Sequence, residues 1–194
     1  MASRPPNPRP THPLARPGDV RGTAEMLALA KRVTAVTGCP VVGGLAVALH
    51  GPARLTEDID IYSDDFEATH EDLVSAGIAW NPRRREHEID GVPVHMIDET
   101  SLGGPPGRTS TIRGVKVIGL ADLVRGELTV GLKELRRAKD IGDVVALIEA
   151  VPLDKAFAAK LPAHLRAPFK ELVDQVRGPR RTSVAPLAYW KKHA

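Results

Sequence analysis

The residues that could do chemistry in this chain begin with two aspartates in a short alternating segment. Asp58, Ile59, Asp60, Ile61 and Tyr62 alternate polar and apolar side chains, as a half-buried strand does. Because successive side chains of a strand point to opposite faces, both carboxylates share one face and both isoleucines share the other. Adjacent carboxylates repel each other unless a cation lies between them, so this pair suits Mg²⁺ holding a polyphosphate.

A glycine pair precedes this segment and indicates an anion site beside it. A short strand is expected to end at Gly43 and Gly44, before a short helix over 45–50. Glycines there let another group approach the backbone closely, and the amides at the start of a helix point towards an arriving anion. Arg54 and Thr56 follow, so one strand-helix-strand unit supplies backbone donors, a cation, a hydroxyl and a candidate pair of metal ligands.

This arrangement resembles the nucleotidyltransferase superfamily that shares the fold of DNA polymerase beta. The signature of that superfamily is a hydrophobic strand ending in Gly-Gly or Gly-Ser, a short helix, and a second strand carrying Asp-x-Asp. The version here resembles the branch of abortive-infection and toxin-antitoxin nucleotidyltransferases, and it implies that Asp58 and Asp60 are catalytic and hold the metal. The residues that it implies for nucleotide binding in this segment are Gly43, Gly44, Arg54 and Thr56.

The third carboxylate of that family's site has no direct counterpart here. Strands are expected over 86–89 and 92–97, joined by a tight Asp90-Gly91 turn, and the position aligned with the carboxylate holds His95. Imidazole brings no negative charge and is a poor Mg²⁺ ligand. Three interpretations stay open: His95 acts as the catalytic base, Asp98 supplies the third metal ligand, or the site binds nucleotide without turnover.

A second part of the resemblance lies in a helix expected over about 132–150. The stretch from Arg136 to Val144 resembles the Arg-x-Lys-Asp-x-x-Asp segment that closes over the nucleotide in these enzymes. It implies that Lys139 and Asp140 take part in nucleotide binding, where basic side chains neutralise phosphate charge. The toxin branch usually has a lysine about one helix earlier, and the aligned residue here is Glu127.

Composition limits the classes of protein to which the chain can belong. Its 194 residues suffice for one domain, with 42% apolar residues but only 4% aromatic ones, so the core is expected to consist of Ala, Val, Leu and Ile. A net charge of +3 permits a nucleotide or nucleic-acid partner without requiring one. Cys39 is the single cysteine; we expect no membrane span, because no apolar run approaches the required length, and no signal peptide, because the N-terminus lacks its apolar centre. We expect a cytoplasmic protein.

The expected fold class is α/β (α+β), with a nucleotidyltransferase-type mixed β-sheet, helices packed on one side and a small helical C-terminal lobe. A Pro- and Arg-rich disordered tail is expected over 1–20 and the nucleotidyltransferase core over 21–118. The helical lobe is expected over 119–178, and a basic tail over 179–194.

The resemblance implies Mg²⁺- or Mn²⁺-dependent transfer of a nucleoside monophosphate from an NTP to a hydroxyl of an acceptor. RNA or a protein is the favoured acceptor over a small molecule, and a toxin-antitoxin role with a cognate antitoxin protein as partner is implied by the branch. Two other classes stay open. His95 and Glu127 favour a catalytically degenerate relative that binds a nucleotide or a partner protein, whereas the basic tails favour a plain nucleic-acid-binding module.

Overall fold

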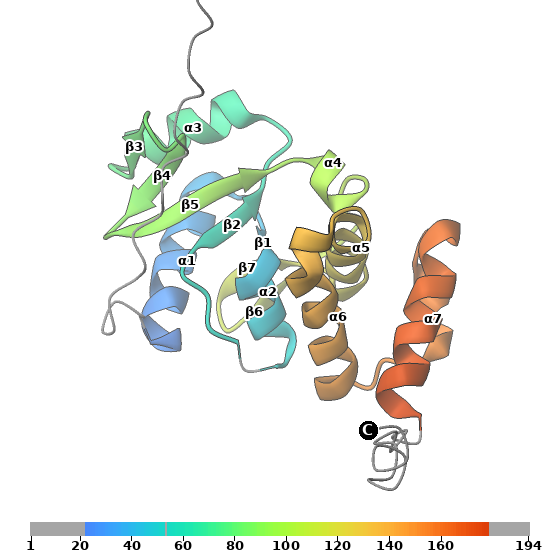
Figure 1. The fold of residues 1–194 in the computed structure, drawn as a ribbon. Coiled ribbons are helices and arrows are strands. Elements are labelled where there is room, and N and C mark those ends of the chain that lie inside the picture. Colours follow the sequence, from blue (N-terminus) through green and yellow to red (C-terminus); the bar gives the residue numbers. More distant parts are fainter. Residues whose placement is uncertain (1–21, 53, 179–194) are drawn as a thin grey trace, which may run out of the picture.

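The computed structural model describes residues 22–52 and 54–178, and these residues form a mixed seven-stranded β-sheet with helices packed against it (Figure 1). The strand order is β3-β4-β5-β2-β1-β7-β6. β1 runs parallel to β7, β2 runs parallel to β5, and the other neighbours are antiparallel. The expected α/β class is confirmed. The strands are β1 (Val41–Val42), β2 (Ile59–Tyr62), β3 (Ala79–Asn81), β4 (Glu86–Ile89), β5 (Val92–Ile97), β6 (Thr109–Ile112) and β7 (Val115–Ile118).

Two tight hairpins set the register of the outer strands. Asp90 and Gly91 connect β4 to β5, and Arg113 and Gly114 connect β6 to β7; all four residues have positive φ. Positive φ at both central residues belongs to the two-residue turn whose twist matches that of the strands. In the first hairpin Ile89 therefore pairs with the residue directly after the turn, and this register carries on along β4 and β5.

Helices α1 (Thr23–Thr37) and α3 (Phe66–Ser75) lie together against the sheet. α1 contacts α3, β2 and β7, and its buried stripe follows helical spacing. Gly38, in the left-handed conformation with φ +66°, ends α1. Gly22 is the N-cap of α1 and makes no side-chain hydrogen bond. The buried residues of α1 are Met26, Leu29, Ala30, Val33 and Thr34.

A group of helices follows the sheet in sequence and packs beside α2 (Gly43–His50). α5 and α6 pack on each other, and both contact α2. The helix expected over about 132–150 begins later than predicted, because its α-helical part starts only at Ala138. α5 ends at Gly131, and α6 folds back across this end, with Ile141 within contact distance of Gly131. The helical elements here are α5 (Leu120–Gly131), η1 (Leu135–Arg137), α6 (Ala138–Ala150), η2 (Lys155–Lys160) and α7 (Ala163–Arg177).

Two short elements were not expected. β3 forms the edge of the sheet although Ala79 and Trp80 are exposed, and α4 (Glu99–Leu102) follows β5. Among the described residues, no helix combines the length and apolar character needed to cross a bilayer. The tails predicted over 1–20 and 179–194 lie outside the described residues.

Candidate functional site

Asp58 lies directly before β2, and Asp60 is the second residue of this strand in the middle of the sheet. Asp60 pairs with Val42 of β1 on one side and with His95 of β5 on the other. The alternating pattern holds: Ile59 and Ile61 are fully buried, whereas both aspartates are half-buried. One potential ligand atom from each of Asp58, Asp60 and His95 lies within 4.8 Å of the others. The structure therefore brings the three residues that sequence reasoning named as catalytic to one point.

His95 forms an ion-pair row with carboxylates on both of its sides. Its Nδ1 lies 3.2 Å from Asp60 Oδ1 and 3.8 Å from Asp58 Oδ2, and its Nε2 lies 3.2 Å from Glu86 Oε2. The hydrogen bond to Asp60 is the main cause that raises the pKa of His95 to about 9; partial burial opposes this shift and the bond to Glu86 adds to it. At neutral pH the ring is therefore an imidazolium, which donates to both carboxylates and cannot accept a proton.

Asp98 lies apart from this cluster. It follows β5 as the N-cap of α4, where its Oδ1 accepts a hydrogen bond of 3.0 Å from the Ser101 amide. Among the described residues, Asp98 does not belong to the candidate metal cluster of Asp58, Asp60 and His95. The third donor beside the two aspartates is thus the His95 imidazole.

Gly43 and Gly44 allow close packing of site side chains at the start of α2. Gly43 has φ +58°, and a Cβ there would overlap the carboxylate of Asp60. A Cβ at Gly44 would overlap the Arg54 guanidinium and crowd the Thr56 hydroxyl. The space left by the missing side chains of Gly43 and Gly44 is therefore occupied by Asp60 and Arg54.

Arg54 and Thr56 brace the site from the loop before β2. The Thr56 hydroxyl donates to Asp58 Oδ1 at 2.9 Å, which orients that carboxylate. Arg54 Nε donates to Asp143 Oδ1 of α6 at 2.7 Å. Arg54 thus connects the glycine turn of α2 to the later helix, across 89 positions of sequence.

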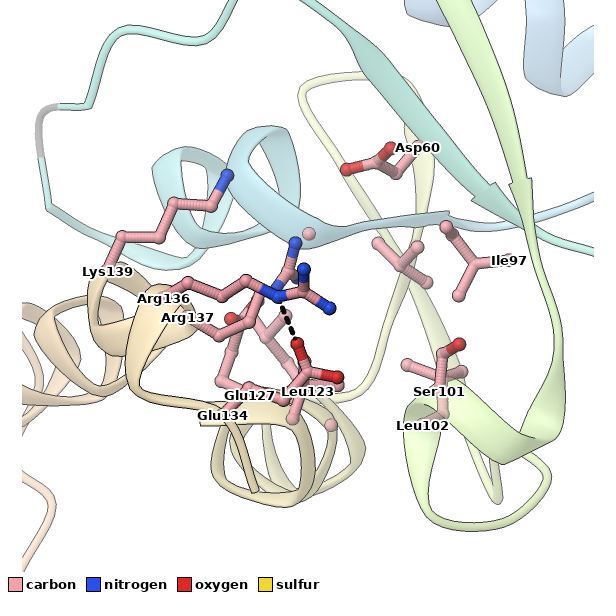
Figure 2. Close-up of a pocket in the computed structure, with 14 residues that line it drawn as sticks. Asp60, Ile97, Ser101, Leu102, Leu123, Glu127, Glu134, Arg136, Arg137 and Lys139 are labelled. Carbon is pink, nitrogen blue, oxygen red and sulfur yellow. Dashed lines mark hydrogen bonds and ion pairs between the residues drawn. The ribbon is translucent and has the colours of Figure 1, made fainter. Parts of the chain in front are cut away.

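A pocket of about 590 Å³ opens beside Asp60, between the sheet and the C-terminal helices. Asp60 and Gly43 line one side, and Arg136, Arg137 and Lys139 extend from η1 and the start of α6 into the same space (Figure 2). Arg136 also pairs with Glu134 at 2.6 Å. The apolar part of the lining consists of Val42, Ile97, Leu102, Leu123 and Val130. Arg136, Arg137 and Lys139, which we call the cationic wall, thus face Asp60 across an apolar floor, with Glu127 and Glu134 on their own side of the pocket.

A second acidic cluster lies behind the cationic wall. Asp140, which is 2% exposed, accepts a bond of 2.7 Å from Arg137, and Asp143 accepts from Arg54. Glu127 is 8% exposed and lines the pocket; burial, together with the nearby Asp143 and Asp140 carboxylates, raises its pKa to about 8. Burial also raises the pKa of Asp143, against the effect of Arg54. Asp140 therefore holds Arg137 in position and does not itself line the pocket.

The cluster of Asp58, Asp60 and His95 has donors that fit a divalent metal ion. Two carboxylates on one strand face suit Mg²⁺ and Mn²⁺ alike. The His95 ring becomes a nitrogen donor to a metal ion only after it has lost a proton, and of these two ions Mn²⁺ accepts nitrogen more readily.

Two residues of the site were missed by sequence reasoning, for different reasons. Glu86 stands beside His95 because the hairpin pairs His87 with Val94, so the predicted Asp90-Gly91 turn already implied this contact. Asp143 meets Arg54 only after the chain has folded, and no local pattern signals that pairing.

No family model matches the sequence, and no curated protein does. Among solved structures, the chain is similar to an antigenic nucleotidyltransferase-like protein from Paracoccidioides brasiliensis. The two are 18% identical, the TM-score is 0.43, and the match covers 66% of this chain and 75% of the other. We therefore infer the function of this chain from its own site.

Proposed function

We propose that this protein transfers a nucleoside monophosphate from an NTP to a hydroxyl group of an acceptor, with release of pyrophosphate. The observation that carries the proposal is the placement of Asp60, with Asp58 beside it, across a pocket of about 590 Å³ from Arg136, Arg137 and Lys139. Phosphoryl transfer depends on positioning and on neutralising charge around the transferred group, and these two walls supply groups for both tasks.

In this proposal Asp58 and Asp60 hold a divalent metal ion beside His95. When bound, such an ion supplies neutralisation of the charge that develops on the phosphate oxygens. Thr56 keeps the Asp58 carboxylate turned toward this position through its hydrogen bond of 2.9 Å. The donors present make Mn²⁺ the better ion for a first assay and Mg²⁺ the second.

The remaining pocket residues bind the NTP. Lys139, Arg136 and Arg137 neutralise the β- and γ-phosphates, since guanidinium groups hold phosphate oxygens in pairs. The apolar floor, which includes Leu102 and Leu123, offers a surface for the base. Arg54 acts as a positioning residue, because its guanidinium already spans Gly44 and Asp143.

The acceptor that we propose is RNA or a protein. A toxin-antitoxin role with a cognate antitoxin partner rests on the sequence resemblance alone, through the Gly-Gly and Asp-x-Asp segment. A radiolabel that follows the α-phosphate into a component of a cell extract would identify the acceptor class directly.

A second candidate function is nucleotide binding without transfer, and the His95 row favours it. The imidazolium lies between Asp60 and Glu86, so it already compensates charge at the point where the proposed metal would sit. A bound ion must compete with that proton. In this reading the pocket still takes an NTP, but no pyrophosphate leaves.

The test incubates the full chain with each α-labelled NTP, Mn²⁺ or Mg²⁺ and a cell extract, and measures both labelled acceptor and pyrophosphate. We expect both products from the natural protein and at least about a hundredfold less from Asp60→Asn, since a carboxylate at the reacting centre is worth several kcal/mol. Asp64→Asn, an exposed aspartate just beyond β2, is the matched control and should retain activity. NTP binding without pyrophosphate under every condition would establish the second candidate instead.

A further inference from the structure

A polar row runs across the sheet from the proposed reaction centre to its edge. Asp60 of β2 pairs with His95 of β5, Glu86 of β4 contacts His95, and Asn81 of β3 pairs with Glu86. Paired residues of neighbouring strands point to the same face, so these side chains lie on the face that carries the carboxylates. The row ends at the turn between β3 and β4.

That turn presents three consecutive arginines. Arg83, Arg84 and Arg85 are all exposed. Arg84 lies 3.4 Å from Glu86, whereas Arg83 and Arg85 form no ion pair with any other residue that the structure describes. The Asn81 side chain accepts from the amides of Arg83 and Arg84, and the Asn81 carbonyl accepts from the amide of Arg85. The turn is therefore shaped by Asn81, at the end of the polar row.

Arg85 occupies a backbone conformation that glycine or asparagine adopts more easily. Its φ is +58°, in the left-handed region, which costs an arginine on the order of 1 kcal/mol. Turn geometry alone gives no reason for a long cationic side chain there.

The arginine turn and the cationic pocket wall lie on opposite sides of the reaction centre. In Figure 1 the β3–β4 hairpin stands on one side of β2 and β5, while α5 and α6 stand on the other. β4 is two strands away from β2 in the sheet order, which corresponds to about 10 Å at the usual strand spacing. The NTP of the proposed function would fill the pocket, so the side of the arginine turn is left for the acceptor.

We propose that Arg83, Arg84 and Arg85 bind the phosphates of an RNA acceptor whose sugar hydroxyl reaches Asp58 and Asp60. This inference rests on the proposed function and specifies its acceptor. An RNA strand carries a hydroxyl for the carboxylate centre and regularly spaced phosphates for cations about 10 Å away. A protein acceptor offers a hydroxyl without a regular row of anions beside it. RNA is therefore the acceptor class that matches both features.

The first experiment measures binding of a fluorescein-labelled single-stranded RNA of about 20 nucleotides and mixed sequence to the full chain over a range of salt. Replacing Arg83, Arg84 and Arg85 together by glutamine should lower RNA affinity about tenfold or more. It should also reduce the slope of log affinity against log salt by about 2, because each lost phosphate contact contributes about 0.7. Binding of a fluorescent NTP should stay unchanged.

Arg113→Gln is the matched control. Arg113 is also exposed, has φ +51° and sits in a tight turn, but it belongs to the β6–β7 hairpin at the opposite edge of the sheet. It should leave RNA affinity and the salt slope unchanged. If the triple variant loses its cooperative thermal unfolding, the single Arg83→Glu variant tests the same surface by charge reversal.

The outcomes separate this inference from the proposed function. Equal RNA affinity and salt slope in the natural protein and the triple variant would overturn the RNA surface, as would a labelled protein acceptor formed at the same rate by both. Absence of pyrophosphate would overturn the transfer reaction, yet the RNA measurement would still decide whether the arginine turn binds RNA.

Discussion

Asp60 is the side chain on which the site geometry converges. Its carboxylate bonds His95, adjoins Gly43 and lines the pocket. The Thr56 hydroxyl donates a hydrogen bond to the Asp58 carboxylate, whereas the Asp60 carboxylate is bonded to His95. Because Asp60 is also the main cause of the raised His95 pKa, its removal has an effect that can be measured without any substrate.

In the metal-free protein, Asp60→Asn should bring the pKa of His95 down from about 9 toward its usual 6.5. A neutral amide no longer favours the imidazolium, while partial burial still disfavours it. Titration of the ring by NMR measures this value directly. Asp98→Asn is the control, since Asp98 caps α4 and should leave the His95 titration unchanged. A His95 pKa that stays near 9 in Asp60→Asn would contradict the assigned cause.

Glu127 should destabilise the folded protein as the pH rises. Its pKa of about 8 in the folded protein lies above the usual 4.5, so ionisation is penalised between these values. Glu127→Gln should match the natural protein below pH 4.5 and exceed its unfolding free energy by a few kcal/mol above pH 8. Urea unfolding at pH 4 and pH 8.5 measures the difference. The exposed Glu149→Gln is the control variant and should change the unfolding free energy little.

At the scale of elements, the Asp60 and Arg54 side chains pack closely against the backbone of the first two residues of α2, Gly43 and Gly44. Gly44→Ala should displace the Arg54 guanidinium from Asp143 and lower the unfolding free energy by about 1–3 kcal/mol. Gly142→Ala is the control on α6, where a Cβ meets nothing within 4 Å, and it should be neutral or stabilising by up to about 1 kcal/mol. Equal unfolding midpoints for the two variants would show that Arg54 can move away without cost.

The elements that sequence reasoning predicted well are those with a strong local period or turn signal. The alternation around Asp60 and the Asp90-Gly91 turn specified β2, β4 and β5. β3 escaped because an exposed three-residue edge strand has no apolar alternation. The break before α6 also escaped, since it arises from tertiary packing of Ile141 against Gly131.

The candidate site divides in the same way. The Asp58 and Asp60 pair could be found from spacing alone, and His95 from the family resemblance, at the position aligned with the third carboxylate. The ion pair of Arg54 with Asp143 could not, because nothing local connects residues 89 positions apart. Asp98 shows the limit of counting along a strand: the strand ends at Ile97, and the next residue turns to cap a helix.

At the scale of the whole molecule, the pocket lies between the sheet and the C-terminal helices, so its ligand should stabilise both. Mn²⁺ with an NTP that cannot be cleaved between its α- and β-phosphates should raise the unfolding temperature by about 5–10 °C at a hundredfold excess over Kd. Lys139→Ala should weaken this shift, and Asp58→Asn with Asp60→Asn should remove its metal dependence. A shift that is equal in all variants would place the ligand elsewhere.

The parallel pairing of β1 with β7 has a consequence for the newly made chain. Val41 finds its partner Val117 only after more than seventy further residues have been added, and Asp143, which holds Arg54, emerges later still. A chain still leaving the ribosome therefore carries the aspartates of β2 before it has either the far half of the sheet or the cationic wall. In the proposed function, nucleotide binding must therefore wait until translation has passed α6.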